Sequence, residues 1–103
     1  MTYSLRLLEE VEDDAYSALV WYEERRTGLG EEFLEAFFAS ARQIPENPHL
    51  HEVVRDDVRR MLLRRFPYAI YYMVEHQTVV VIGLFHCARD PRIVEAEVRA
   101  RNT

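Results

Sequence analysis

The sequence has no lysine, a single cysteine and no long apolar run. Cys87 alone cannot form an internal disulfide, and it has no companion cysteines with which to build a structural zinc site. Its position inside an apolar run predicts a small, buried side chain. No segment approaches the roughly 18 apolar residues of a membrane span, and the first residues lack the zones of a secretory signal. We therefore expect a cytoplasmic protein with no membrane partner.

The absence of lysine also limits the chemistry that the chain can perform. All 13 basic residues are arginines, which excludes a lysine base but permits fork-like recognition of carboxylate or phosphate. The formal net charge of −5 argues against a broad nucleic-acid-binding surface. Residues 1–54 carry 12 acidic and 4 basic side chains, whereas residues 55–103 carry 6 acidic and 9 basic ones. The two halves therefore face different partners or each other.

The first half of the chain predicts a strand and two helices. A length of 103 residues with 49% hydrophobic side chains suits one domain, which we assign to residues 1–103. Residues 3–8 alternate as a short strand does, and an amphipathic helix follows, with acidic residues at its start and arginines at its end. After two glycines, a second helix is predicted from about Glu31 to Gln43. The two helices should form an antiparallel hairpin that needs a sheet beneath it.

The second half predicts a three-strand antiparallel meander. Residues 45–57 show no clear period and are interpreted as a surface connection. The strands are expected at about Val58–Arg65, Tyr68–Glu75 and Thr78–Cys87. The last of these is apolar on both faces, which is typical of an interior strand, so the N-terminal strand and the arginine-rich strand should be the edges. With a short, weak helix in residues 89–103, the predicted class is α+β.

Five pieces of sequence, in a fixed order, resemble the RelE/ParE superfamily of toxins, and the ParE-like branch more closely. They are Ala18–Glu23, Gly28–Leu34, Asn47–Pro48, Arg64–Tyr72 and His86–Pro91, and the likeness covers roughly residues 3–92. The resemblance implies a RelE-like fold and the toxin of a type II toxin-antitoxin system. Such a toxin inhibits bacterial growth when free, contributes to plasmid stabilisation, needs no cofactor and is neutralised by a cognate antitoxin in a hetero-oligomer.

The resemblance leaves the cellular target open. ParE-like members are associated with poisoning DNA gyrase, whereas RelE-like members cleave messenger RNA on the ribosome, and a degenerate member would bind its antitoxin without toxicity. Fold alone does not decide between them. The absence of lysine, the acidic pI of about 5.3 and Ala69, which aligns with an arginine of the RNA-cleaving relatives, favour the ParE-like branch, without enzymatic activity.

Under the nuclease alternative, a metal-free endoribonuclease, the candidate catalytic residues are His86, Arg65 and Arg89. Histidine suits acid–base work near neutral pH, and arginine stabilises charge on a phosphoryl group. His86 shares strand parity with Val80, Ile82 and Leu84, however, which favours a packed histidine. Arg89 is followed by an aspartate and is equally suited to a local ion pair or to capping the last helix.

A cluster of four arginines is the candidate antitoxin-binding site. The simplest interpretation is the solvated face of an edge strand, where charge deters aggregation. Our hypothesis is that acidic side chains of a disordered antitoxin tail engage these arginines, because strand addition and the docking of a helix in a groove are standard modes of peptide recognition. The four residues are Arg59, Arg60, Arg64 and Arg65.

Histidines and aromatic residues elsewhere do not predict a further site. His49 and His51 lie two apart, but no third ligand is placed nearby, so no metal is expected. Aromatic side chains invite a hypothesis of base stacking, yet packing in a core or an interface is their more common use. The residues concerned are Trp21, Tyr16, Tyr22, Tyr68, Tyr71 and Tyr72.

Overall fold

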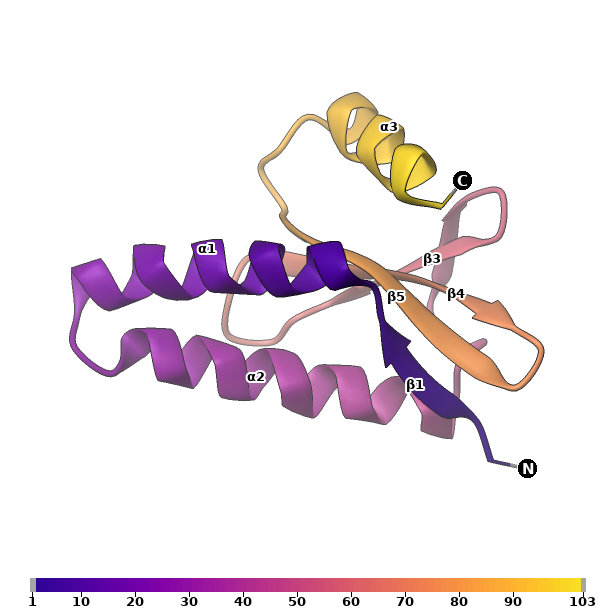
Figure 1. Ribbon diagram of the computed structural model, residues 1–103, viewed down its shortest axis with the longest axis horizontal. Coiled ribbons are helices and arrows are strands. Elements are labelled where there is room, and N and C mark those ends of the chain that lie inside the picture. Colours follow the sequence, from indigo (N-terminus) through magenta and orange to yellow (C-terminus); the bar gives the residue numbers. More distant parts are fainter. Residues whose placement is uncertain (1, 103) are drawn as a thin grey trace.

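The computed structural model describes residues 2–102 and confirms the α+β class. Helices α1 (Glu9–Arg25) and α2 (Leu29–Gln43) lie side by side against one face of a sheet, and α3 (Pro91–Arg101) lies on the other face (Figure 1). None of the helices within residues 2–102 is long and apolar enough to cross a membrane. The remaining elements are β1 (Ser4–Leu7), η1 (Ile44–Glu46), β2 (Glu52–Arg55), β3 (Val58–Leu62), β4 (Tyr68–Glu75) and β5 (Thr78–His86).

The corner between α1 and α2 is held by one carboxylate. Gly28 adopts a left-handed conformation with φ 90°, which favours glycine. The Glu23 carboxylate accepts the N–H of Gly28 at 2.9 Å and the N–H of Gly30 at 3.0 Å, so it satisfies two amides at the start of α2. The second helix therefore begins at Leu29, two residues before the predicted start.

The five strands are ordered β1-β5-β4-β3-β2, and the meander from β2 to β5 is antiparallel. This order confirms the N-terminal strand as one edge. β1 pairs with β5 in parallel, with Ser4 opposite Thr78 and Leu7 opposite Val81. The sheet is therefore mixed, where the sequence predicted antiparallel pairing alone.

The prediction that the arginine-rich strand forms the other edge is wrong. The predicted surface connection contains β2, which pairs with β3 and takes the edge position. A two-residue turn joins them, and Asp56 adopts φ 50° there, which aspartate tolerates better than most residues. β3 also ends at Leu62 instead of Arg65, so Arg64 and Arg65 lie in the turn before β4.

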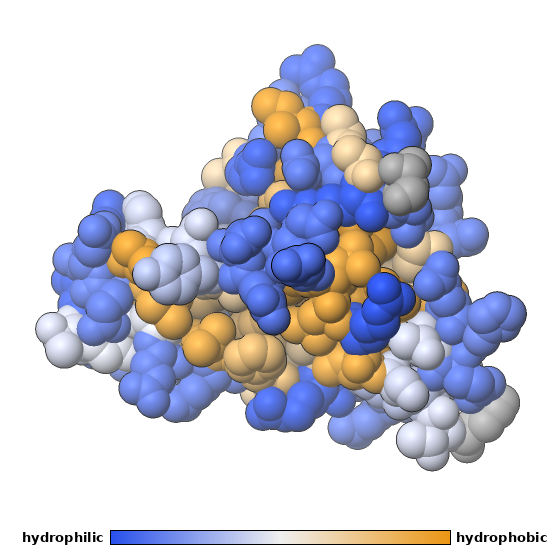
Figure 2. All heavy atoms as spheres, in the orientation of Figure 1, coloured by the Kyte–Doolittle hydropathy of each residue, from blue (hydrophilic) through white to orange (hydrophobic). Residues whose placement is uncertain are grey.

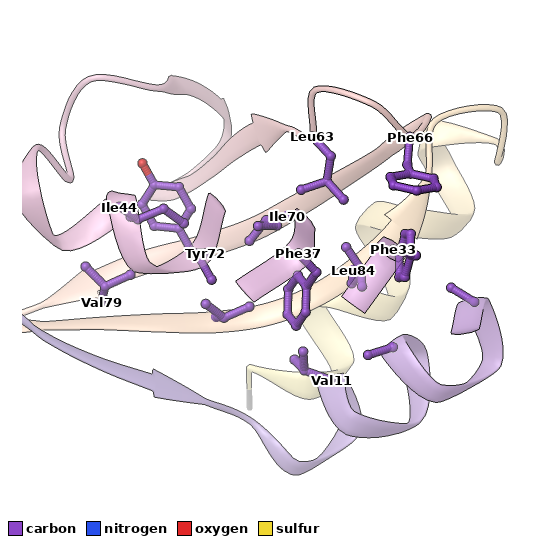
Figure 3. Close-up of a cluster of buried hydrophobic side chains, with 14 of the residues drawn as sticks. Val11, Phe33, Phe37, Ile44, Leu63, Phe66, Ile70, Tyr72, Val79 and Leu84 are labelled. Atoms are coloured by element: carbon purple, nitrogen blue, oxygen red, sulfur yellow. The ribbon is translucent and has the colours of Figure 1, made fainter. Parts of the chain in front are cut away.

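The larger hydrophobic core lies between the helical hairpin and the sheet (Figure 3). Phe33 and Phe37 of α2 meet Ile70 and Leu84 of the sheet, and Figure 3 shows these side chains pointing toward one another. The Tyr72 ring is buried, and its hydroxyl donates to the Pro48 carbonyl at 2.8 Å, which satisfies the polar end of the ring. This core fixes the hairpin on the sheet.

A smaller apolar cluster lies on the opposite face of the sheet, beneath α3. The Asp90 side chain caps α3 by accepting the Arg92 N–H at 2.9 Å, and Pro91 occupies the first turn. The helix is therefore well defined, where the sequence predicted a weak one. The cluster consists of Ala69, Tyr71, Ile82, Phe85, Val94 and Val98.

A β-bulge in β5 changes which side chains share a face. Tyr72 is opposite Val81 and Tyr71 is opposite Gly83, so Ile82 is an extra residue on β5. Leu84 therefore joins the hairpin core, whereas Ile82 packs beneath α3. For this reason, the prediction that His86 lies on the same face of the sheet as Val80 and Ile82 is wrong. His86 does lie on the same face as Leu84, which is the side of the helical hairpin.

The prediction that Cys87 is buried is also wrong. β5 ends at His86, and Cys87 lies exposed in the turn that leads to α3. Its backbone N–H donates to the Pro67 carbonyl at 2.8 Å, so the peptide group is fixed while the thiol faces solvent. The predicted strand, Thr78–Cys87, is therefore one residue longer than β5.

A largely buried ion pair joins α3 to α1 and to the edge of β5. The Arg101 guanidinium donates to both oxygens of the Asp14 carboxylate, at 2.7 and 3.0 Å, and to the Ile82 carbonyl at 3.1 Å. Asp14 also accepts the Leu84 N–H at 3.1 Å. The two side chains are only 10% and 12% exposed, and together they satisfy β5 backbone groups beyond the end of β1. We refer to this pair as the Asp14–Arg101 clamp.

Replacing Arg101 by methionine should lower the free energy of unfolding by about 3 kcal/mol, because the Asp14 carboxylate would remain buried without its counterion. Urea denaturation measures this loss. Arg92→Met is the matched control, since the Arg92 side chain is 90% exposed and its ion pair is open to solvent. Equal urea midpoints for the two variants would contradict the assigned role of the clamp.

Candidate functional site

Two hollows adjoin the end of the sheet where β3 turns into β4. The first, the arginine groove, is an open groove of about 770 Å³ between α2 and the β2–β3 edge. Small and apolar side chains of α2 and β3 form its walls, and three arginines lie at its rim. The groove is lined by Ala36, Ala39, Ser40, Gln43, His51, Glu52, Arg60, Met61, Leu62, Arg64 and Arg65.

The four predicted antitoxin-binding arginines are not equivalent. Arg60, Arg64 and Arg65 line the groove, and Arg60 of β3 forms an ion pair with Glu52 of the neighbouring edge strand β2. Arg59 does not line the groove: its guanidinium donates to the carbonyls of His49 at 3.1 Å and of His51 at 2.7 Å. The structure therefore brings three of the four together and gives Arg59 a structural role in holding the segment before β2.

Arg64 and Arg65 differ in their engagement with acidic groups. Arg65 donates to Glu32 of α2 at 2.8 Å, and Arg26 contacts the same carboxylate at 3.2 Å. The hydrogen bond from Arg65, assisted by Arg26, lowers the pKa of the Glu32 carboxyl below its usual range. Arg64 is exposed and forms no ion pair with any other residue in the described range 2–102. Its charge is available to an external partner.

The second hollow, the histidine hollow, has a volume of about 470 Å³ and lies between α1 and the end of β5. Trp21 forms part of its wall with its indole 49% exposed. The buried face of α1 consists of Val11, Ala15, Ala18 and Tyr22, and Trp21 lies outside it. The hollow is lined by Asp14, Ser17, Ala18, Trp21, Tyr68, Leu84, Phe85, His86 and Arg89.

Three hydrogen-bond donors line the histidine hollow. The Nδ1 atom of His86 accepts the Ala88 N–H at 3.0 Å, so the proton of a neutral ring resides on Nε2. The Tyr68 ring lies 5.1 Å from the His86 ring, and burial raises the pKa of the Tyr68 hydroxyl, which stays protonated at neutral pH. Arg89 lies over the Phe85 ring at 5.2 Å and forms no ion pair within residues 2–102.

A row of aromatic rings joins the arginine groove to the histidine hollow. The Arg65 guanidinium lies 5.3 Å from the centre of the Phe66 ring. Phe66 packs edge-on against Tyr22 at 4.9 Å, and Tyr22 lies 6.1 Å from Tyr68, which adjoins His86. The two hollows are therefore neighbours, with the rings of Phe66, Tyr22 and Tyr68 between them.

The three candidate catalytic residues do not form one site. His86 and Arg89 line the histidine hollow, whereas Arg65 lies at the arginine groove and is paired with Glu32. Ala69, the position at which the sequence analysis expected the arginine of RNA-cleaving relatives, is 2% exposed and packs beneath α3 with Phe85. The geometry therefore gives no cation at that position and separates Arg65 from His86 and Arg89.

Several functional neighbours were not found from the sequence. The ion pair of Asp14 with Arg101 joins residues 87 positions apart, and Glu32 meets Arg65 across 33 positions. Periodicity places such residues on a helix face but does not pair distant elements. In the described part of the chain, no group of three or more metal-ligating His, Cys, Asp or Glu side chains occurs, and the rings of His49 and His51 lie edge-on to Tyr3 and Tyr72 instead.

Comparisons with known proteins agree on one family. The profile of the family described as "ParE toxin of type II toxin-antitoxin system, parDE" matches residues 5–91. The chain is 28% identical over 102 residues to Toxin ParE2 of Mycobacterium tuberculosis, and the matched region covers 98% of this chain and 97% of ParE2. The sequence resemblance to the RelE/ParE superfamily is thereby confirmed.

Two solved structures share the fold. A chain of the chromosomal ParDE TA system from P. aeruginosa matches with a TM-score of 0.72 and 13% identity, over 82% of this chain and 96% of that one. A doubly substituted variant of the E. coli toxin RelE in the free state matches with a TM-score of 0.63 and 19% identity, over 100% of both chains. At these identities, the likeness concerns the fold.

Replacing Arg65 by alanine should raise the pKa of Glu32 toward its ordinary value of 4.5, because the hydrogen bond that lowers it is lost. A lowered folded-state pKa stabilises the fold above pH 4.5, and this contribution is lost as the pH falls through the folded value. An NMR titration of the Glu32 side chain measures the shift. Arg64→Ala should leave the titration unchanged, and an unchanged pKa in Arg65→Ala would refute the assigned pairing.

Proposed function

Because the chain belongs to the ParE toxin family of type II toxin-antitoxin systems, we propose that it inhibits bacterial growth when free by acting on DNA gyrase. We also propose that a cognate antitoxin neutralises it by binding in the arginine groove. The main support for antitoxin binding is the groove itself. Arg60, Arg64 and Arg65 all line it, and Arg64 is exposed and forms no ion pair with any residue in the described range. Fork-shaped guanidinium groups suit acidic side chains of an antitoxin tail.

Apolar surface extends the groove along α2. A shallow hollow shares Ala39 with the arginine groove, and its apolar lining residues are Leu34, Phe38 and Ala39, with Phe38 39% exposed. The charged residues Glu31, Glu35 and Arg42 complete its lining. Figure 2 shows apolar residues gathered along the seam between α1 and α2 and beside β1, within an otherwise hydrophilic face. An amphipathic antitoxin segment would bury this surface while its acidic residues meet the arginines.

The choice of a protein target over messenger RNA is supported by two features. The sheet face that carries Ala69 is filled by Phe85, Val94 and Val98 under α3, so the arginine of the RNA-cleaving relatives has no counterpart there. The chain also carries a net charge of −5 and no lysine, which disfavours contact with a polyphosphate backbone.

Expression of this chain alone in a bacterium should stop DNA synthesis before protein synthesis. Pulse labels for the two processes, taken at short intervals after induction, measure the order. Early loss of protein synthesis would contradict a gyrase-directed toxin and favour the messenger RNA endonuclease. Unaffected growth, with the protein folded and able to bind its antitoxin, would instead identify a member without toxicity.

Replacing Arg60, Arg64 and Arg65 together by alanine should weaken the antitoxin complex about tenfold and reduce its dependence on salt, because three rim charges are removed. Arg59 is retained in this variant, since its guanidinium holds two backbone carbonyls. Surface plasmon resonance with the cognate antitoxin measures the affinity at low and high salt. Arg92 and Arg99, exposed on α3, supply a control double variant that should bind normally. Equal loss in both variants would remove the groove proposal.

A further inference from the structure

The histidine hollow has the composition of a binding site, and neither the family nor the antitoxin proposal assigns it a ligand. Its donors, Arg89, the Nε2 atom of His86 and the Tyr68 hydroxyl, have no acceptor within residues 2–102. The one carboxylate in the wall, Asp14, is already satisfied by Arg101 and by the Leu84 N–H. The hollow therefore presents donors to an external acceptor, and the charge of Arg89 favours an anion.

The wall beside these donors is apolar and held in place. The Arg25 guanidinium lies 3.6 Å above the centre of the Trp21 ring and also donates to the Trp21 carbonyl at 3.2 Å. The edge of the indole packs against Tyr22 at 5.0 Å. Because the indole is already fixed, the Trp21 side chain would lose less conformational entropy when a ligand binds against it. A ligand that carries its anion next to an apolar group fits both parts of the hollow.

The surrounding charge selects a carboxylate over a nucleic-acid backbone. The first turn of α1, the helix that forms one wall, carries Glu9, Glu10 and Glu12, and Glu24 lies beside Arg25 near its end. A polyphosphate strand would meet these acidic groups, whereas a single carboxylate needs only the Arg89 guanidinium and its neighbouring donors. Protein segments supply isolated carboxylates flanked by apolar side chains.

We infer that the histidine hollow binds an acidic, apolar segment of a target protein, with a carboxylate on Arg89 and His86 and an apolar side chain on Trp21. This inference rests on the proposed function, because it makes the hollow the surface through which the toxin contacts its target. The aromatic row from Phe66 to Tyr68 places the hollow beside the arginine groove. An antitoxin in the groove then lies next to the target segment and excludes it sterically.

Trp21 is the only tryptophan in the chain and reports directly on the hollow. Fluorescence titration uses the peptide acetyl-Leu-Leu-Glu-Leu-Leu-amide, which has one carboxylate flanked by apolar side chains, as the probe and its glutamine counterpart as the matched control. The acidic peptide should change the Trp21 emission saturably and bind about tenfold more tightly than the glutamine peptide, since a charge-assisted hydrogen bond is lost in the control. Equal binding of the two peptides, or no saturable change, would overturn the inference.

Two protein variants and one small anion complete the titration. Arg89→Ala should weaken the acidic peptide about tenfold, whereas Arg64→Ala, which removes an equally exposed arginine at the other hollow, should not. Full binding by Arg89→Ala would overturn the inference. Inorganic phosphate should bind more weakly than the peptide, and tighter phosphate binding would reassign the hollow to a phosphorylated ligand and also overturn it.

Growth assays then connect the hollow to toxicity. Arg89→Ala and Trp21→Ala should reduce growth arrest while copurifying with the antitoxin in normal amounts. Full arrest by both variants would show that the hollow does not contact the target. Failure of the unaltered chain to arrest growth would instead contradict the proposed function, and the peptide titration would still decide whether the hollow binds carboxylates.

Discussion

The Asp14–Arg101 clamp is the interaction on which the arrangement of the three layers depends. It joins α1, the unpaired edge of β5 and α3, which are far apart in the sequence. β1 covers β5 only as far as Val81, and the clamp satisfies the next outward-facing backbone groups, at Ile82 and Leu84, where an open strand edge would otherwise remain. By fixing the end of α3, it also keeps Tyr71 and Phe85 covered.

With α3 held on one face and the hairpin on the other, the exposed functional features gather at one end of the sheet. The turn before β4 carries Arg64 and Arg65, and the turn after β5 carries Arg89. These turns come together because β4 and β5 pair with Tyr68 opposite His86. The arginine groove and the histidine hollow thus become neighbours. If the antitoxin tail binds in the groove and the target binds at the hollow, as we propose, the bound antitoxin would block the target sterically.

Much of the fold could be predicted from the sequence because its elements have strong local signals. The apolar stripe from Val11 to Tyr22 indicates a helix by its period. The run Tyr68–Glu75 indicates a strand because it is short and rich in aromatic and β-branched residues. β2 was missed because four residues with an exposed Val53 give no period. The bulge at Ile82 was missed because β5 is apolar on both faces, so an extra residue does not change the hydrophobic pattern. The bulge places His86 and Val80 on opposite faces of the sheet. The candidate site was predicted only in part, since pairings such as Arg65 with Glu32 depend on packing between distant elements.

We propose that the Asp14–Arg101 clamp keeps α3 in place while the antitoxin binds in the arginine groove. Hydrogen–deuterium exchange of the toxin, measured with and without its cognate antitoxin, tests this proposal. We expect slower exchange in residues 36–43 and 59–65 on binding, with exchange in α3 unchanged. Faster exchange throughout α3 on binding, with the groove segments unaffected, would show that the antitoxin displaces α3 instead and would contradict binding in the groove.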